Sequence, residues 1–281
     1  MSSILVTGAT GSFGRAFVKR CLDESLWDRV CVFSRDEHKQ AQMRDELNND
    51  ARLRFFIGDV RDRDRLQWAM KDVDVVVHAA ALKRIETGHY NPTEMVKTNV
   101  LGAMNVVEAA QATTVEKVVA LSSDKAWQPV SAYGQSKALA ETIFLSANNT
   151  RGANGPIYAV TRYGNVAGSN GSVIPKWREL IERGQDIEIT DPECTRFWMR
   201  LDQAVDLVLD TIDTMQGGEL AIPTLPAYRL GDLATAMGAR QFMAIGLPPW
   251  EKLCEGMRDG MTSDRARRMS VEELQQELAR V

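Results

Sequence analysis

The chain has 281 residues, of which 44% are hydrophobic and 26% are charged, and this is the composition of a globular protein with a sizeable core. Its formal net charge of -4 argues against nucleic acid or an anionic membrane as the main partner, and no apolar run approaches the ~20 residues of a membrane-spanning helix. The four cysteines have neither paired nor zinc-ligand spacing and no basic leader precedes the first apolar run, so we expect a cytoplasmic protein without a metal site.

Short β-branched runs alternate with amphipathic stretches through the first half of the chain. This alternation predicts βαβ units and an α/β fold, a doubly wound parallel sheet of the Rossmann type. The expected strands are Ser3–Thr7, Arg29–Ser34, Leu53–Ile57, Val73–Ala79, Lys117–Ser122 and Ile157–Arg162. The expected helices between them include Gly14–Glu24, Glu37–Leu47 and Pro92–Ala112.

After about Tyr163 the pattern becomes irregular, because glycine, proline and aromatic residues interrupt short helices. We therefore expect a dinucleotide-binding domain over residues 1–163, with the catalytic residues in it. A small substrate-binding region over residues 164–281 is expected to be partly interleaved with the sheet. Ser270 and Glu273 have the form of a capping box, which predicts a last helix.

The first predicted strand is followed by the sequence TGATGSFG, which opens the first helix. Glycines three apart let the backbone turn sharply and approach a pyrophosphate, whose charge the helix N-terminus stabilises. A plain tight turn could carry the same glycines, but their place between a first strand and a first helix favours a dinucleotide. The expected cofactor-binding residues here are Gly8, Thr10, Gly11, Ser12, Phe13 and Gly14.

The second predicted strand ends at Ser34, where an NAD enzyme would carry an acidic residue for the ribose hydroxyls. Arg35 follows, and Lys39 comes one helical turn later. A guanidinium beside a small hydroxyl suits a 2′-phosphate, so these three residues favour NADP over NAD. The alternative is that both cations are solvated charges at a helix start.

Tyr133 and Lys137 form a YxxxK pattern in a helical stretch after the fifth predicted strand, and at this spacing they share one helix face. A nearby ammonium favours phenolate, so we expect the pKa of Tyr133 to be lowered and the tyrosine to act as a base. An exposed Tyr–Lys pair is the alternative, but the position after a strand favours catalysis.

Four longer blocks of the sequence are specific enough to compare with known proteins. They are HAAALKRIETGHYNPTEMVKTNVLGAMNVVEAA, SSDKAWQPVSAYGQSK, TRYGNVAGSNGSVIPKW and ITDPECTRFWM. The glycine spacing is similar to that of extended short-chain dehydrogenases/reductases. Within that family the four blocks resemble the inverting UDP-N-acetylglucosamine 4,6-dehydratases of pseudaminic acid pathways, and the similarity runs from about Ile4 to about Met257.

The resemblance implies a lyase that removes water from a UDP-amino-sugar and recycles its nicotinamide cofactor. Tyr133 would take the C4 hydroxyl proton, with Ser123 on the C4 oxygen and Lys137 on the nicotinamide ribose. Lys125 would remove the C5 proton, and Asp124 would protonate the leaving C6 hydroxyl. These last two roles require a lowered pKa for Lys125, expected from burial and from Lys137, and a raised pKa for Asp124, expected from burial.

The resemblance also implies further contacts. For the cofactor they are Asp59 and Val60 at the adenine, and Ala79, Ala80 and Ala81 along the dinucleotide. For the substrate they are Lys83 and Asn165 at the sugar, and Thr195 and Arg196 at the diphosphate. A turn asparagine and surface cations are the alternative interpretation of the substrate residues.

One segment departs from the family pattern. Relatives usually read like GxRPGEKLHE near the C-terminus, whereas residues 246–255 here read GLPPWEKLCE. Pro248 replaces an arginine that is expected to hold the diphosphate, so the exact sugar nucleotide stays open.

Two other functions are compatible with parts of the sequence. A nucleotide-sugar 4-epimerase or 4-ketoreductase needs the tyrosine and lysine but no elimination pair, so Asp124 and Lys125 argue against it. A non-catalytic NADP-sensing protein tends to lose the tyrosine or the lysine, and both are present. The resemblance suggests a homo-oligomer.

Overall fold

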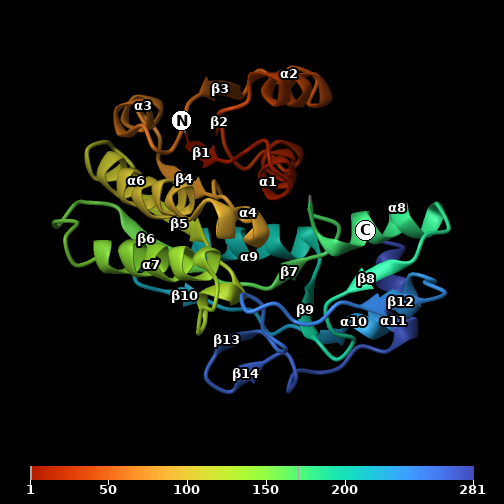
Figure 1. Cartoon of the computed structure of the whole chain (residues 1–281). Coiled ribbons are helices and arrows are strands. Elements are labelled where there is room, and N and C mark those ends of the chain that lie inside the picture. Colours follow the sequence, from red (N-terminus) through yellow and green to blue (C-terminus); the bar gives the residue numbers. More distant parts are fainter. Residues whose placement is uncertain (1, 170) are drawn as a thin grey trace.

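The computed structural model describes residues 2–169 and 171–281. At its centre lies a sheet of seven parallel strands in the order β10-β6-β5-β4-β1-β2-β3 (Figure 1). The order 3-2-1-4-5-6, here extended by one strand, is that of a Rossmann sheet, and it confirms the predicted fold class. The strands are β1 (Ser3–Thr7), β2 (Arg29–Ser34), β3 (Leu53–Ile57), β4 (Val75–His78), β5 (Lys117–Leu121), β6 (Ile157–Thr161) and β10 (Leu220–Ala221). The first three predicted strands match to the residue, and the next three differ by one or two residues at their ends.

Successive residues of the central strands enter two different cores. Ile4 and Val6 of β1 lie in one core and Leu5 lies in the other, because side chains alternate between the faces of a strand. Helices cover both faces, which explains why these strands are almost continuously apolar. The covering helices are α1 (Ser12–Asp23), α2 (Glu37–Glu46) and α9 (Leu201–Thr214) on one face and α3 (Arg63–Ala69), α6 (Gly102–Gln111) and α7 (Ala132–Ala147) on the other.

The helix predicted to run on from Pro92 is not continuous. After α4 (Ile85–Tyr90), α5 (Pro92–Met95) passes into a π-helical segment, η1 (Val96–Leu101), before α6 begins. Within η1 the buried Asn99 accepts from the Leu82 N–H at 2.8 Å and donates to the Leu82 carbonyl at 2.9 Å and to Ser136 Oγ at 2.9 Å. The segment therefore ties the loop after β4 to helix α7.

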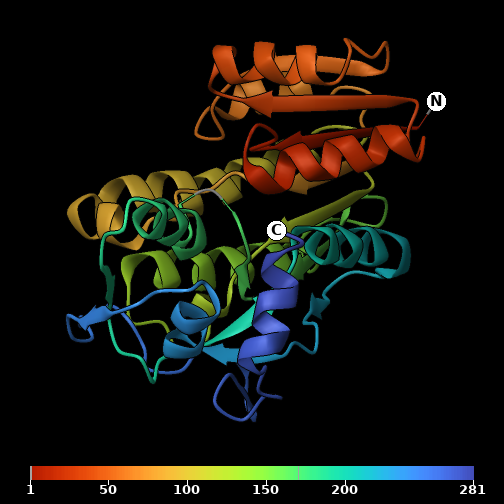
Figure 2. The ribbon, with the colours of Figure 1, turned by 90° about the vertical axis from the view of Figure 1, so that its right-hand side faces the viewer.

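The second half of the chain forms three smaller sheets in its described residues and also contributes strand β10 to the main sheet. Its own core gathers Trp177, Ile187, Trp198, Leu233 and Leu274, and Figure 2 shows this green-to-blue part below the N-terminal strands. The small sheets have the orders β11-β9-β7, β12-β8 and β13-β14. Their strands are β7 (Asn165–Val166), β8 (Ile187–Ile189), β9 (Thr195–Met199), β11 (Ala227–Arg229), β12 (Phe242–Ala244), β13 (Gly256–Arg258) and β14 (Met261–Thr262). The helices are α8 (Val173–Glu182), α10 (Leu230–Ala236) and α11 (Val271–Leu278).

The last helix begins as predicted. Ser270 Oγ accepts from the Glu273 N–H at 3.2 Å, and the Glu273 carboxylate accepts from the Ser270 N–H at 2.9 Å. This confirms the capping box, which satisfies two N–H groups that a helix start would otherwise leave unpaired.

Within the described ranges, no helix combines the length and apolar character needed to cross a membrane. The same part of the chain contains no group of three or more His, Cys, Asp or Glu residues that could hold a metal ion.

Candidate active site

The glycine-rich turn after β1 brings the chain close to the end of β4. Gly8 has a φ of +67°, and a Cβ there would lie 2.8 Å from the Ala80 Cα. A Cβ on Gly14 would lie 2.4 Å from the Ala9 Cα, so only glycine lets α1 pack on the turn. A Cβ on Gly11, by contrast, would meet only the Gly8 carbonyl, at 3.2 Å. The middle glycine thus leaves room in front of the α1 N-terminus, as a bound pyrophosphate requires.

The other predicted cofactor residues of this region lie around the same turn. Phe13 stacks on Phe17 with ring centroids 5.6 Å apart. The Ala80 N–H donates to Thr7 Oγ1 at 3.3 Å. The turn, its helix start and the loop after β4 hold Thr10, Ser12, Ala79 and Ala81.

The end of β2 carries the residues predicted to choose between NADP and NAD. Ser34 is buried, and its Oγ accepts from Gln40 Nε2 at 3.0 Å. The Arg35 side chain is 56% exposed and lies 3.6 Å from the Asp59 carboxylate. Lys39 pairs with the carboxylate of Asp36 at 3.5 Å. The residues predicted at the ribose, Ser34 and Arg35, thus lie beside the loop after β3 that carries the residues predicted at the adenine, Asp59 and Val60. Val60 is buried.

The predicted acid–base pair lies just beyond the end of β5, in a 3-10 turn, η2 (Asp124–Ala126). Asp124 Oδ1 accepts from Ser123 Oγ at 2.9 Å and lies 3.1 Å from Lys125 Nζ. Lys125 Nζ also donates to Asn165 Oδ1 at 3.2 Å and lies 3.4 Å from Glu255 Oε1. The structure therefore brings together five residues. Four of them were predicted from separate motifs, and the fifth, Glu255, was not predicted.

Helix α7 packs directly on this turn. A Cβ on Gly134 would lie 2.3 Å from the Lys125 carbonyl oxygen, so glycine after Tyr133 lets the turn and the helix touch. Ser131 caps the helix by accepting from the Gly134 N–H at 3.1 Å. One turn further on, Lys137 Nζ donates to the Leu121 carbonyl at 2.5 Å, which ties the helix to the end of β5.

Burial dominates the electrostatics of Asp124. Its side chain is 0% exposed, and Oδ2 has no hydrogen-bond partner among the described residues. Burial raises the pKa of Asp124, although the neighbouring Lys125 opposes the shift. The raised pKa that the acid role requires is thus confirmed.

The expected shift of Lys125 is wrong. Burial by itself lowers the pKa of Lys125, but the carboxylates of Asp124 and Glu255 outweigh burial and hold that pKa above its ordinary value. The sequence-based expectation missed Glu255, which comes 130 residues after Lys125. In this structure Lys125 is therefore an ammonium that must lose its proton before it can act as a base.

The expected lowering for Tyr133 is also wrong. Burial raises the pKa of Tyr133, and the charge of Lys125 and a hydrogen bond with Ser123 only partly offset this effect. Lys137, from which the lowering was expected, is itself buried and donates to the Leu121 carbonyl. Burial lowers the pKa of Lys137 to about 8, against the pull of Glu141.

The predicted substrate residues differ in their surroundings. Asn165 faces Lys125, as described above, whereas Lys83 lies exposed in the loop after β4. Arg196 is buried, pairs with Glu251 at 2.5 Å and donates to the Thr195 carbonyl at 2.8 Å. The Thr195 hydroxyl is paired with Ser263 Oγ at 2.6 Å. The role of Thr195 and Arg196 in binding the diphosphate stays a prediction. It requires Arg196 to give up its ion pair with Glu251 and to bind phosphate instead.

Sequence reasoning missed three residues that organise the site. Asn99 holds the loop after β4, as described above. Glu255 is 1% exposed, and its Oε2 lies 2.9 Å from Lys252 Nζ. Lys252 and Glu255 both stand in the GLPPWEKLCE segment, but sequence spacing gives no sign that this segment reaches Lys125. Trp250, at the position where the family pattern has glycine, packs against His89 with ring centroids 4.4 Å apart and the ring planes inclined by 31°.

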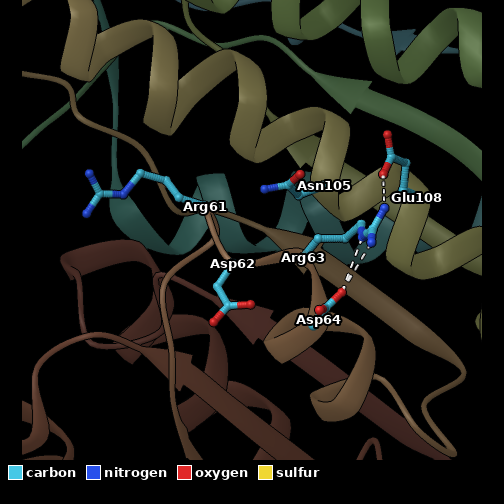
Figure 3. A pocket seen from close by; sticks show the side chains of 6 residues that line it. All are labelled: Arg61, Asp62, Arg63, Asp64, Asn105 and Glu108. Atoms are coloured by element: carbon cyan, nitrogen blue, oxygen red, sulfur yellow. Dashed lines mark hydrogen bonds and ion pairs between the residues drawn. The ribbon is translucent and has the colours of Figure 1, made fainter.

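A surface depression of about 460 Å³ lies away from this cluster, beside α3 and α6 (Figure 3). Its lining residues are Arg61, Asp62, Arg63, Asp64, Asn105 and Glu108. Arg63 pairs with Asp64 at 3.3 Å and with Glu108 at 3.4 Å, as the dashed lines in Figure 3 show. Because these charges pair with one another on an open surface, the depression does not compete with the buried cluster as an active site.

Comparison with known proteins places the chain in a family. A family model described as "Polysaccharide biosynthesis protein" matches residues 4–275. This chain belongs to that family. The predicted resemblance to extended short-chain dehydrogenases/reductases, which use a nicotinamide cofactor, is confirmed with it. That the glycine turn binds this cofactor stays a prediction.

Two curated relatives have different names at the same identity. A UDP-N-acetylglucosamine 4,6-dehydratase (inverting) from Campylobacter jejuni is 44% identical over 257 residues, which cover 91% of this chain and 77% of the relative. A UDP-glucose 4-epimerase from Rickettsia bellii is 44% identical over 238 residues, which cover 84% of this chain and 70% of the relative.

Two solved structures are similar to this chain over nearly its whole length. The X-ray structure of Pen from Bacillus thuringiensis superposes with a TM-score of 0.95 at 33% identity, over 100% of this chain and 98% of the other. A dTDP-glucose 4,6-dehydratase from Streptomyces venezuelae with NAD bound has a TM-score of 0.84 at 21% identity, over 99% and 96% of the two chains, and shows the same fold.

Proposed function

We propose that this protein is an NADP-dependent UDP-N-acetylglucosamine 4,6-dehydratase, a lyase that inverts C5 and gives a UDP-4-keto-6-deoxy-amino-sugar. The contact between Asp124 and Lys125, 3.1 Å apart beside the Ser123–Tyr133–Lys137 group, carries this proposal. An elimination needs an acid and a base besides the residues that serve C4 oxidation. The Campylobacter jejuni relative bears the name of this activity.

The residues divide the reaction between them. Tyr133 accepts the C4 hydroxyl proton as phenolate, which Lys125 and Ser123 are placed to favour. When bound, the nicotinamide would supply the hydride acceptor for C4 and the hydride donor for C6, with no net redox change. The C4 ketone acidifies C5–H, Lys125 removes that proton, and Asp124 protonates the leaving C6 hydroxyl, which departs as water. A proton then returns to C5 from the opposite face, which balances the proton that Tyr133 took up.

The pairing of Lys125 with Asp124 already holds the protons that this step needs. Transfer of one proton from Lys125 Nζ to Asp124 Oδ1 converts an ion pair into a neutral base and a neutral acid. Elimination then restores the ammonium and the carboxylate, because the base gains one proton and the acid loses one. Since the Asp124 side chain is 0% exposed, the side chains that cover it must move when the sugar binds.

The cofactor proposal is NADP rather than NAD. Arg35 has an exposed guanidinium beside the buried Ser34 hydroxyl, and no acidic side chain stands at the end of β2 itself. A guanidinium there can hold a 2′-phosphate through paired donors, in exchange for its 3.6 Å contact with Asp59. Residues 1–163 would bind this cofactor and residues 164–281 the UDP-sugar, through Asn165 and Arg196.

A UDP-sugar 4-epimerase is the second candidate, because a relative with that kind of name has the same 44% identity, although over a smaller share of this chain. Epimerisation needs the tyrosine but gives no use to a buried acid–base pair. Incubation of the full chain with UDP-N-acetylglucosamine and NADP, followed by mass spectrometry, separates the candidates. We expect a product lighter by one water. An epimer of unchanged mass identifies an epimerase, and no turnover with bound cofactor supports a sensor.

The remaining expectations stay predictions. A homo-oligomer is checked by light scattering of the purified chain. A cytoplasmic location is consistent with Cys21, Cys31, Cys194 and Cys254, which are all free thiols.

A further inference from the structure

Glu255 joins the C-terminal part of the chain to the acid–base turn. Its side chain is 2% exposed; Oε1 lies 3.4 Å from Lys125 Nζ, and Oε2 lies 2.9 Å from Lys252 Nζ. The Glu255 backbone N–H donates to Ser263 Oγ at 2.9 Å, which fixes the residue in place. Lys252 in turn donates to the Trp127 carbonyl at 2.8 Å. Two lysines therefore share one buried carboxylate.

Charged and titratable groups from several elements face Lys125. Asp124 on η2 and Glu255 ahead of β13 attract the ammonium, while Arg196 on β9 repels it. The phenols of Tyr133 on α7 and Tyr228 on β11 also interact with it. Asp124 adjoins Lys125 in the chain, so Glu255 is the attracting group that only the tertiary fold supplies.

We propose that Glu255 is a positioning residue, whose carboxylate holds the Lys125 ammonium beside Asp124 between turnovers. Lys252 forms an ion pair with the other carboxylate oxygen and so weakens the attraction between Glu255 and Lys125. The meaning of this contact for catalysis rests on the proposed function, in which Lys125 is the C5 base. The contact itself is a property of the folded chain. It sets how readily Lys125 releases its proton, because an opposite charge this near changes proton affinity by about ten- to a thousandfold.

Acylation of Lys125 measures this release without substrate, because only a neutral amine attacks an acylating reagent. The full chain is treated with acetic anhydride at several pH values, and modification of each lysine is followed by peptide mass spectrometry. Lys19, with a side chain 63% exposed, serves as the internal reference. We expect Glu255→Gln to raise the rate at Lys125 at least tenfold relative to Lys19, and Lys252→Met to lower it.

Glu251→Gln is the matched control. Glu251 stands in the same segment and pairs with Arg196 rather than Lys125, so its loss leaves the rate at Lys125 within about twofold. Glu255→Asp keeps a carboxylate and returns the rate toward wild type. Equal rates in Glu255→Gln and Glu251→Gln overturn the proposal. If Glu255→Gln does not fold, Lys252→Met decides alone, and a faster rate in that variant overturns it.

The same variants separate this proposal from the proposed function. If the chain is a dehydratase, the acid limb of its pH profile moves to lower pH in Glu255→Gln, because Lys125 becomes neutral more easily. If the chain releases no water from any UDP-sugar, the acylation result still decides whether Glu255 holds Lys125.

Discussion

Replacing Lys125 with methionine removes an ammonium from between two buried carboxylates. Lys125 Nζ lies 3.1 Å from Asp124 and 3.4 Å from Glu255, whose side chains are 0% and 2% exposed. With an effective dielectric constant of about 20, each attraction amounts to about 5 kcal/mol before the cost of desolvation. Methionine keeps most of the side-chain length, so the change is mainly one of charge.

We expect the free energy of unfolding to fall by about 3 kcal/mol at pH 7, the lower end for breaking a buried pair. Protonation of Asp124, whose pKa burial already raises, limits the loss. The loss shrinks as the pH falls, because protonation removes the unpaired negative charge. The double variant Lys125→Met/Glu255→Gln should recover part of the stability, since it removes one of the two carboxylates.

Three measurements on Lys125→Met test the reasoning. Urea unfolding followed by tryptophan fluorescence gives the stability, and titration calorimetry with NADP should show unchanged affinity. Release of water from UDP-N-acetylglucosamine should fall by about 10²–10⁴-fold, the contribution of an acid–base group. A folded variant that binds NADP and still releases water near the wild-type rate refutes the base role.

Three further predictions concern the cofactor, the substrate and the sheet. Arg35→Ala should reduce the preference for NADP over NAD by at least about 1 kcal/mol in calorimetry, and equal affinities of the wild type for both cofactors contradict it. Pro248→Arg should lower KM for the UDP-sugar with little change in kcat, the sign of uniform binding, and an unchanged KM means that another residue already holds the diphosphate. His78 is buried beside Thr7 and burial lowers its pKa to about 3, so below pH 6.5 the unfolded chain takes up a proton that the folded chain refuses. Wild-type stability should therefore fall by about 1.4 kcal/mol per pH unit between pH 6.5 and 3 relative to His78→Gln, and parallel urea-unfolding curves for the two proteins contradict this.

The sheet could be predicted because its signal is local. Buried parallel strands such as Val75–His78 are short apolar runs between helical stretches, and glycines mark the cofactor turn. The π-helical segment at Val96–Leu101 could not be predicted, because one widened turn is too short for hydrophobic periodicity to distinguish it from an α-helix. It is the buried hydrogen bonds of Asn99 that reveal its role.

The grouping of the candidate residues around the turn after β5 could be predicted, but their charge state could not. Ser123–Lys125 and Tyr133–Lys137 stand close together in the sequence, so their motifs locate them. The proton affinity of Lys125 depends on Glu255, which tertiary packing alone brings to 3.4 Å. For the same reason, the sequence predicted Arg196 as an open phosphate ligand, whereas Glu251 pairs with it in the structure.

In the proposed reaction, Lys125 and Asp124 eliminate water from the sugar with inversion at C5. Turnover of UDP-N-acetylglucosamine by the wild-type protein with NADP in deuterated water, with the product examined by NMR, tests this reaction. We expect a 4-keto-6-deoxy sugar that carries deuterium at C5 in the inverted configuration. A product that retains the C5 configuration, or that keeps its C6 hydroxyl, contradicts it.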